Sequence, residues 1–229
     1  MASDLRSGVE QSGPRSSSGQ MTVSATPGLI VARDLDLVAW LDRLVGASVE
    51  QIRARFGLGR TQAYRRLQVL QDFGLVRRRH LTATRPPLYT VASRSLRVAS
   101  CEHAHALTDL VVAIESSGGE IATELELRRE RNRQPALVGR LTDRQLATVL
   151  GCPRVPDAAE LLGSGGLGAF EIELSSKGRA RRTAVLASYA ISDYESVTWI
   201  APDPQLRVLI NREVTERGLA EFMEVRDGI

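Results

Sequence analysis

The sequence predicts a mixed α/β (α+β) fold, and two patterns of apolar residues carry this prediction. Residues 34–73 keep the spacing of amphipathic helices, whereas short alternating segments typical of strands occur between helical ones after residue 100. The second pattern gives the order α-β-β-β-α-β, which describes an α/β domain. We therefore expect a disordered tail over residues 1–28, a helical domain with a hairpin over 29–95 and an α/β domain over 96–229.

Bulk composition excludes several classes of protein. The chain has 229 residues, of which 43% are hydrophobic, so it is long enough to bury a core. No apolar run approaches the roughly 20 residues that span a bilayer, and the N-terminus lacks the apolar segment of a secretory signal. Cys101 and Cys152 have no metal-binding or disulfide spacing. A bacterial, cytoplasmic and nucleoid-associated protein fits, and the arginine bias is typical of a high-GC genome.

The helical part predicts a helix-turn-helix followed by a hairpin. Apolar positions mark helices over 34–45, 49–56 and 61–73. Ser48 with Gln51 three residues later makes a capping box at the start of the second helix, and Gly57 ends it. Two short helices joined by a glycine-containing turn are the helix-turn-helix signature. Strands expected over 76–81 and 88–91 would then form a wing, which gives a winged helix-turn-helix.

Arginines concentrate in the same stretch. Residues 53–85 hold nine arginines against a single acid, Asp72, although the net charge of the whole chain is only +3. Such a local basic surface suits the phosphates of double-stranded DNA. The alternative is a charged helix face that only contacts water. Side chains near the start of the third helix can reach base edges. The predicted DNA-binding residues are Arg60, Thr61, Gln62, Tyr64, Arg65 and Arg66 on that helix, and Arg77, Arg78, Arg79 and Arg85 in the wing.

The α/β part is predicted from shorter segments. Helices are expected over 102–116, 143–150, 179–190 and 206–218, and strands over 121–127, 155–161, 169–174 and 197–201. Residues 131–153 form an insertion that contains the second of these helices. Residues 163–168 are a glycine-rich turn with no helix after it, so it is not a phosphate loop.

Carboxylates gather on two of these strands. Glu171 and Glu173 are two residues apart, so both side chains point to one face of the sheet. If Asp157 lies on the adjacent strand, three carboxylates converge and need a counter-charge. A divalent cation such as Mg²⁺ or Mn²⁺ would supply it, with Asp157, Glu171 and Glu173 as ligands, and so would an arginine or Lys177. Glu124 and Glu126 are expected to face the same way from the first strand.

These motifs in this order resemble the PD-(D/E)XK nuclease-like fold. More closely, residues 33–205 are similar to the replication-relaxation family of bacterial plasmid and mobile-element proteins. The matching segments are Glu102-His103, residues 123–127, Pro156-Asp157-Ala158, residues 171–177 and Tyr189. The resemblance implies a nuclease site with Asp157, Glu171, Glu173 and Lys177 as catalytic residues. An active nuclease of that fold carries acid-x-lysine on the strand, whereas Glu173 stands in the lysine position here, so the acids could equally bind arginine.

Three functions are consistent with these observations. The first is a double-stranded DNA-binding protein of a plasmid or mobile element, acting in replication, transfer or transcriptional control. The second is a metal-dependent DNA endonuclease of the PD-(D/E)XK type. The third is a non-catalytic module that dimerises or recruits a partner. The expected partners are DNA, a second copy of the chain and a replication or transfer protein, with no membrane.

Overall fold

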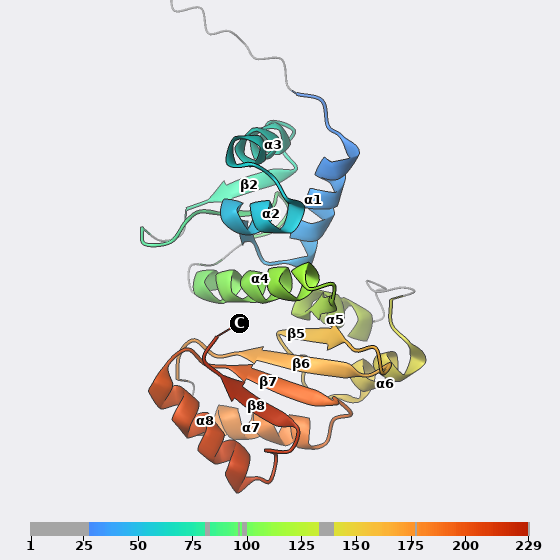
Figure 1. Cartoon of the computed structure of the whole chain (residues 1–229), viewed down its shortest axis with the longest axis vertical. Helices are drawn as coiled ribbons and strands as arrows, with labels where there is room; N and C mark the ends of the chain where they lie inside the picture. The colour runs from blue at the N-terminus through green and yellow to red at the C-terminus, as the bar shows by residue number, and fades with distance from the viewer. Residues whose placement is uncertain are drawn as a thin grey trace, which may run out of the picture.

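The computed structural model describes residues 28–80, 83–95, 97, 100–132, 140–176 and 178–228. These residues form a mixed α/β fold in which helices pack on two separate sheets, which confirms the predicted fold class. Figure 1 shows helix α4 lying between the smaller sheet with its helices and the larger sheet. In the described ranges, no helix is long and apolar enough to cross a membrane. The predicted tail over residues 1–28 lies outside them except for Gly28.

Three helices and a three-stranded sheet make up the N-terminal part. In chain order they are α1 (Ala32–Arg43), β1 (Ala47–Ser48), α2 (Val49–Phe56), α3 (Arg60–Asp72), β2 (Val76–Arg79) and β3 (Leu88–Val91). The capping box at α2 forms as predicted, since the Gln51 N–H donates to Ser48 Oγ at 3.3 Å and the Ser48 N–H donates to Gln51 Oε1 at 2.8 Å. Gly57 ends the helix with a φ of +58°, a conformation that favours glycine.

The small sheet has the strand order β1-β3-β2, and both pairs are antiparallel. β2 and β3 form the predicted hairpin, in which Arg78 lies opposite Tyr89. The predicted end of the first wing strand at Leu81 falls outside the described residues. β1 is two residues long and was not predicted, because so short a strand has no alternating pattern of its own.

The C-terminal part is built on a five-stranded sheet. Its elements are α4 (Cys101–Ser116), β4 (Glu120–Thr123), α5 (Glu124–Arg131), α6 (Asp143–Gly151), β5 (Ala158–Leu161), β6 (Leu167–Ile172), α7 (Arg179–Ala190), β7 (Ser196–Ile200), α8 (Pro204–Glu216) and β8 (Met223–Arg226). The strand order is β4-β5-β6-β7-β8; β4, β5 and β6 are mutually antiparallel, and β7 and β8 continue in parallel. The predicted order α-β-β-β-α-β is present, as are the predicted helix of the insertion (α6) and the closing helix (α8), whereas α5 and β8 were not predicted.

The expected strand over residues 121–127 is wrong in its second half. β4 ends at Thr123, and α5 begins at Glu124. Thr123 accepts from the Glu126 N–H, and the Glu126 side chain accepts from the Thr123 N–H at 2.9 Å, so the segment contains a capping box that starts a helix. Glu124 and Glu126 therefore lie on a helix, and the prediction that they join a carboxylate face of the sheet is wrong.

Helix α4 joins the two parts through one hydrophobic core. Its residues Leu107, Leu110 and Val111 are buried in the same cluster as Leu41 of α1 and Ile172 of β6. A second cluster fills the other face of the large sheet, which α7 and α8 cover (Figure 1). The small sheet and its helices are thus held on α4, whose opposite side faces the large sheet.

Candidate functional site

The exposed face of α3 carries half of the predicted DNA-binding residues. Ala63, Leu67 and Leu70 are fully buried, so the opposite face of the helix points to solvent. Tyr64 is 39% exposed. The other exposed residues in the first part of this helix are Arg60, Thr61, Gln62 and Arg65. The helical spacing that predicted α3 therefore also predicted these exposed side chains, whereas Arg66, expected on the same side, is partly buried.

Four arginines of the basic stretch are paired within the protein. Arg53 pairs with Glu50, and Arg55 pairs with Glu115 of α4. Arg66 donates to both carboxylate oxygens of Asp34, with 2.8 Å between Nε and Oδ1. It also donates to the Leu29 carbonyl at 3.0 Å. Arg85 binds Glu102. Of these four, Arg66 and Arg85 were predicted to bind DNA; the structure gives each of them a carboxylate partner, although Arg85 stays exposed.

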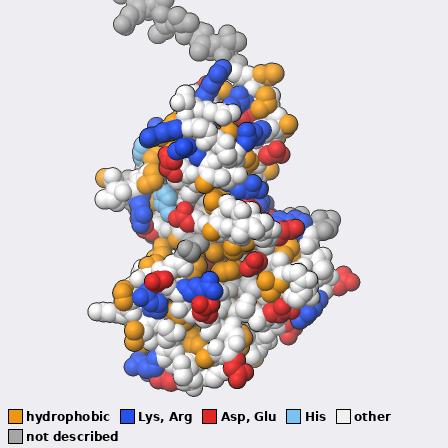
Figure 2. All heavy atoms as spheres, in the orientation of Figure 1, with side chains coloured by type: hydrophobic (Ala, Val, Ile, Leu, Met, Phe, Trp, Pro, Cys, Tyr) orange, Lys and Arg blue, Asp and Glu red, His pale blue; other side chains and the backbone are white. Residues whose placement is uncertain are grey.

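The remaining arginines of the stretch lie on α3 and β2. Within the described residues, no ion pair involves Arg60, Arg65, Arg77 or Arg78. Arg77 and Arg78 are exposed, whereas Arg79 is partly buried. Figure 2 shows Lys and Arg side chains gathered over the upper part of the molecule, where α3 and β2 lie.

Tyr89 connects α3 with the hairpin. Burial raises the pKa of the Tyr89 hydroxyl, and the charge of Tyr64 adds to the rise, whereas the positive charge of Arg78 opposes it. Arg78 of β2 and Tyr64 of α3 are therefore both close to the same side chain. We call the exposed residues of the helix and of the hairpin strand the arginine surface: Arg60, Thr61, Tyr64, Arg65 and Arg78.

A polar cleft of about 510 Å³ lies between the start of α4 and the large sheet. His103 Nε2 is 3.5 Å from Asp157 Oδ1, and the Ile172 N–H donates to Asp157 Oδ2 at 2.7 Å. Burial would raise the pKa of Asp157, but the hydrogen bond and charge of His103, the Ile172 N–H and Arg154 together lower it. The predicted acid is therefore present as a paired carboxylate.

Glu171 has an arginine as its counter-charge. Arg154 donates from Nε to Oε1 at 2.9 Å and from Nη2 to Oε2 at 3.0 Å, and the Tyr189 hydroxyl donates to Oε1 at 2.5 Å. Glu171 is 2% exposed, and its burial raises the pKa of the carboxyl, with Asp157 adding to the rise. The bidentate contact and the tyrosine oppose this rise by stabilising the charged form.

Glu173 is also buried and, like Glu171, which binds Tyr189 of α7, it lies toward α7. Its charge acts on Arg182, which pairs with Glu213 of α8 at 3.0 Å. Lys177, the fourth predicted catalytic residue, lies outside the described residues. The structure therefore brings Asp157 and Glu171 close together, with Arg154 beside them, and places Glu173 near the Arg182–Glu213 pair.

These carboxylates do not fit a Mg²⁺ or Mn²⁺ site. Both oxygens of Glu171 accept from Arg154, and both oxygens of Asp157 have donors. A hard cation would need those lone pairs, and the arginine already supplies the positive charge. Among the described residues, no group of three or more His, Cys, Asp or Glu side chains is placed to hold a metal ion. The sequence left a divalent cation, an arginine or Lys177 as the counter-charge of these carboxylates, and in the structure Arg154 binds Glu171.

Arg154 was not predicted as a site residue, although a signal was available. It stands three residues before Asp157 and directly after Pro153, in a segment without apolar period. An arginine near two buried carboxylates is a plausible partner, yet the sequence does not reveal that β6 brings Glu171 beside it.

No protein-family model matches this chain, and no curated protein matches it either.

Proposed function

We propose that the protein binds double-stranded DNA through the arginine surface. The observation that carries this proposal is the sorting of the arginines: four of the nine in the basic stretch have carboxylate partners, and Arg60, Arg65, Arg77 and Arg78 remain exposed without an ion pair in the described residues. Unpaired guanidinium groups on a rigid helix and strand suit the phosphates of a duplex. Thr61 and Tyr64, between the arginines, are positioned to contact bases or sugars.

The topology of the N-terminal part supports a winged helix-turn-helix. The chain runs α1-β1-α2-α3-β2-β3, with β3 in the middle of the small sheet. In that fold the third helix enters the major groove and the hairpin contacts the adjoining backbone. α3 would be the recognition helix, and the β2–β3 hairpin the wing.

The C-terminal part supports a nuclease-like frame without nuclease chemistry. Three antiparallel strands followed by a helix and a parallel strand match the order expected for the PD-(D/E)XK-like fold. Arg154 on Glu171 supports a non-catalytic role for this domain. We infer a cytoplasmic, nucleoid-associated protein of a bacterial plasmid or mobile element, related to the replication-relaxation family. It would act in replication, transfer or transcriptional control, with a second copy or a replication protein as a further partner.

Binding of duplex DNA by charge variants tests the proposal. Arg65→Ala and Arg78→Ala should each weaken binding several-fold at moderate salt, because each removes a phosphate contact. The slope of log K against log salt should fall by about 0.9 per lost contact. Arg212→Ala is the matched control, since Arg212 is 67% exposed on α8, far from the arginine surface. Fluorescence anisotropy with a labelled duplex measures both quantities. Equal binding by all three folded variants would contradict the proposal.

A further inference from the structure

An ion pair ties the hairpin to α4. Arg85 Nε donates to Glu102 Oε1 at 3.0 Å, and Arg85 Nη2 lies 2.5 Å from Glu102 Oε2, so the contact between guanidinium and carboxylate is bidentate. The side chains are 52% and 46% exposed. Arg85 is the arginine nearest β3 in the loop of the hairpin, and Glu102 belongs to the first turn of α4. The pair therefore joins the proposed wing to the helix on which the rest of the protein is built.

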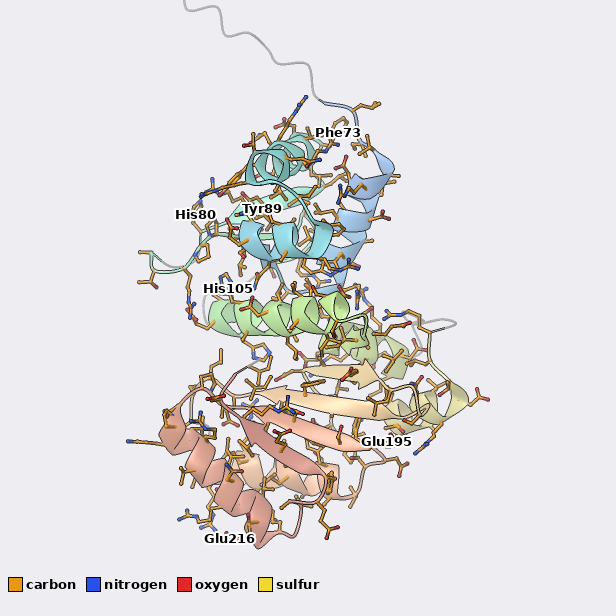
Figure 3. The ribbon with its side chains drawn as sticks, viewed as in Figure 1. Phe73, His80, Tyr89, His105, Glu195 and Glu216 are labelled. Carbon is orange, nitrogen blue, oxygen red and sulfur yellow. The ribbon has the colours of Figure 1, made fainter. Side chains whose placement is uncertain are left out.

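Residues at the start of α4 contact both the hairpin and the cleft. Glu102 pairs with Arg85, the next residue His103 pairs with Asp157, and the buried imidazole of His105 lies near the backbone of Pro86. Burial and the nearby Arg85 charge lower the pKa of His105. Figure 3 shows His105 on α4, below Tyr89 of β3 and below His80, which directly follows β2. The hairpin loop thus rests on this turn, with Arg85 at its solvent-facing edge.

The energetics of the pair favour exchange over stability. An exposed ion pair contributes about 0 to 1 kcal/mol to folding, because water screens it and two long side chains must be ordered. A DNA phosphate offers the same guanidinium an equivalent bidentate acceptor and a stronger field. Replacing Glu102 by phosphate would therefore cost little.

From this geometry we infer that Glu102 is an internal competitor for DNA: it holds Arg85 on α4 in the free protein, and a backbone phosphate takes Arg85 over when the duplex binds. Glu102 then sets the affinity, since part of the binding free energy is spent on breaking the pair. This inference rests on the proposed DNA binding. It adds Glu102, a residue outside the arginine surface, as one that lowers the affinity for DNA.

A charge-neutral variant isolates this role. Glu102→Gln should raise the affinity for duplex DNA about two- to fivefold, the equivalent of an exposed ion pair, because Arg85 is released. The matched control is Asp109→Asn, which removes the same charge from the same helix. Asp109 is exposed and accepts from Gln51 Nε2 at 2.7 Å, a bond that asparagine keeps. Asp109→Asn should therefore report only the general effect of removing a negative charge near DNA.

A double-mutant cycle separates competition from that general effect. Arg85→Ala should weaken binding more in the Glu102→Gln background than in the wild type, and Glu102→Gln should act no more strongly than Asp109→Asn once Arg85 is absent. Equal gains for Glu102→Gln and Asp109→Asn in the presence of Arg85, or strictly additive variants, would overturn the inference. Wild-type protein that fails to bind the duplex at all would instead overturn the proposed function.

Discussion

Arg65 and Arg66 are neighbours in the chain with opposite environments. Arg65 is exposed on α3 without an ion pair in the described part of the protein, whereas Arg66 holds the buried Asp34 at the start of α1. Asp34 is 2% exposed and also accepts from the Val31 N–H at 2.8 Å. Burial would raise the pKa of Asp34, but Arg66 and Val31 lower it overall. Arg66 therefore positions α3 against α1, and Arg65 is the one of the two that belongs to the proposed DNA-binding surface.

Single alanine variants should separate these two roles. Arg66→Ala leaves Asp34 buried without its cation, so the free energy of unfolding should fall by about 1 to 3 kcal/mol. Arg65→Ala should leave the free energy of unfolding nearly unchanged, as is usual for an exposed side chain. Urea unfolding of both variants measures the difference. Equal stability of the two variants would contradict the positioning role of Arg66.

At this scale the sequence predicted exposure but not pairing. Helical spacing places Arg60 and Arg65 on the solvent side of α3, and the structure confirms it. The partners of the other arginines come from distant segments: Asp34 is 32 residues from Arg66, and Glu115 is 60 residues from Arg55. No local pattern encodes such contacts, because they depend on how helices pack. The pairing of Arg154 with Glu171 was unpredictable for the same reason.

Among the elements, α5 shows how a local signal can override an alternating pattern. Residues 121–127 alternate apolar and polar side chains, which predicted one strand. Thr123 and Glu126 instead form a capping box, and Thr123 Oγ1 also donates to the Arg43 carbonyl at 2.6 Å. The strand therefore ends where the helix begins. Helices α2 and α7 were predicted with the correct bounds, and for α2 the capping box at Ser48 and the glycine at position 57 marked both ends.

Removing the cap of α5 should be costly. Thr123→Ala deletes the acceptor for the first turn and the bond to Arg43, so we expect a loss of about 1 to 2 kcal/mol in the free energy of unfolding. Thr215→Ala is the control: its hydroxyl donates to the Asn211 carbonyl on the exposed side of α8, and its loss should change stability by less than about 0.5 kcal/mol. Thermal or urea unfolding compares them, and equal losses would contradict the capping role.

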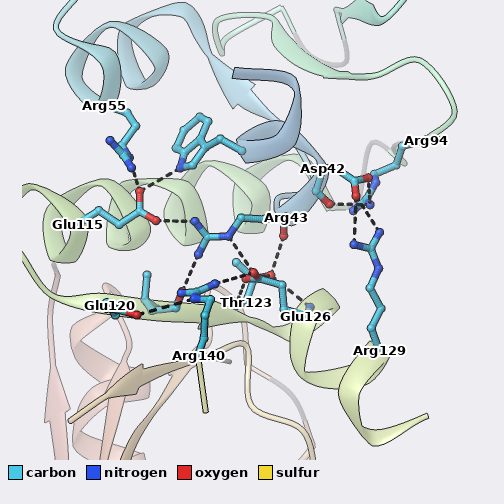
Figure 4. Close-up of polar contacts among 12 residues, drawn as sticks. Asp42, Arg43, Arg55, Arg94, Glu115, Glu120, Thr123, Glu126, Arg129 and Arg140 are labelled. Carbon is cyan, nitrogen blue, oxygen red and sulfur yellow. Dashed lines mark hydrogen bonds and ion pairs between the residues drawn. The ribbon is translucent and has the colours of Figure 1, made fainter. Parts of the chain in front are cut away.

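Across the whole molecule, a buried ionic network holds the two parts together. Arg43 of α1 binds Glu115 of α4 at 2.6 Å and Glu126 of α5 at 2.9 Å, and Arg55 joins at Glu115 (Figure 4). The Trp40 indole also donates to Glu115, at 3.0 Å. The domain boundary expected at residue 95 precedes α4, which packs on both parts. Neither the network nor the shared core was visible in the sequence, because its members come from four separate elements.

The charge of Glu115 should make this junction sensitive to acid. Burial would raise the pKa of Glu115, but Arg43 and Arg55 lower it below the ordinary 4.5. A lowered folded-state pKa gives stability that is present above the unfolded value and lost as pH falls through the folded value. Glu115→Gln should thus reduce the free energy of unfolding by about 1 to 3 kcal/mol at neutral pH. The difference from wild type should shrink below about pH 4.

Urea unfolding across this pH range checks the prediction. Glu216→Gln is the control, since Glu216 is 55% exposed on α8 and contacts only Arg212 among the described ion pairs. Its effect should be small at every pH. A difference between Glu115→Gln and wild type that stays constant down to the acid limit would mean that the carboxylate charge does not stabilise the junction.

Photo-crosslinking tests the central claim, DNA binding through α3, most directly. A photoreactive phenylalanine analogue replaces Tyr64, which is 39% exposed on α3, or Val208, which is 71% exposed on α8 at the other end of the molecule (Figure 1). Irradiation with labelled duplex DNA should give a protein–DNA crosslink from position 64 that high salt suppresses, and none from position 208. Crosslinks of equal yield at both positions, or at position 208 alone, would contradict the account.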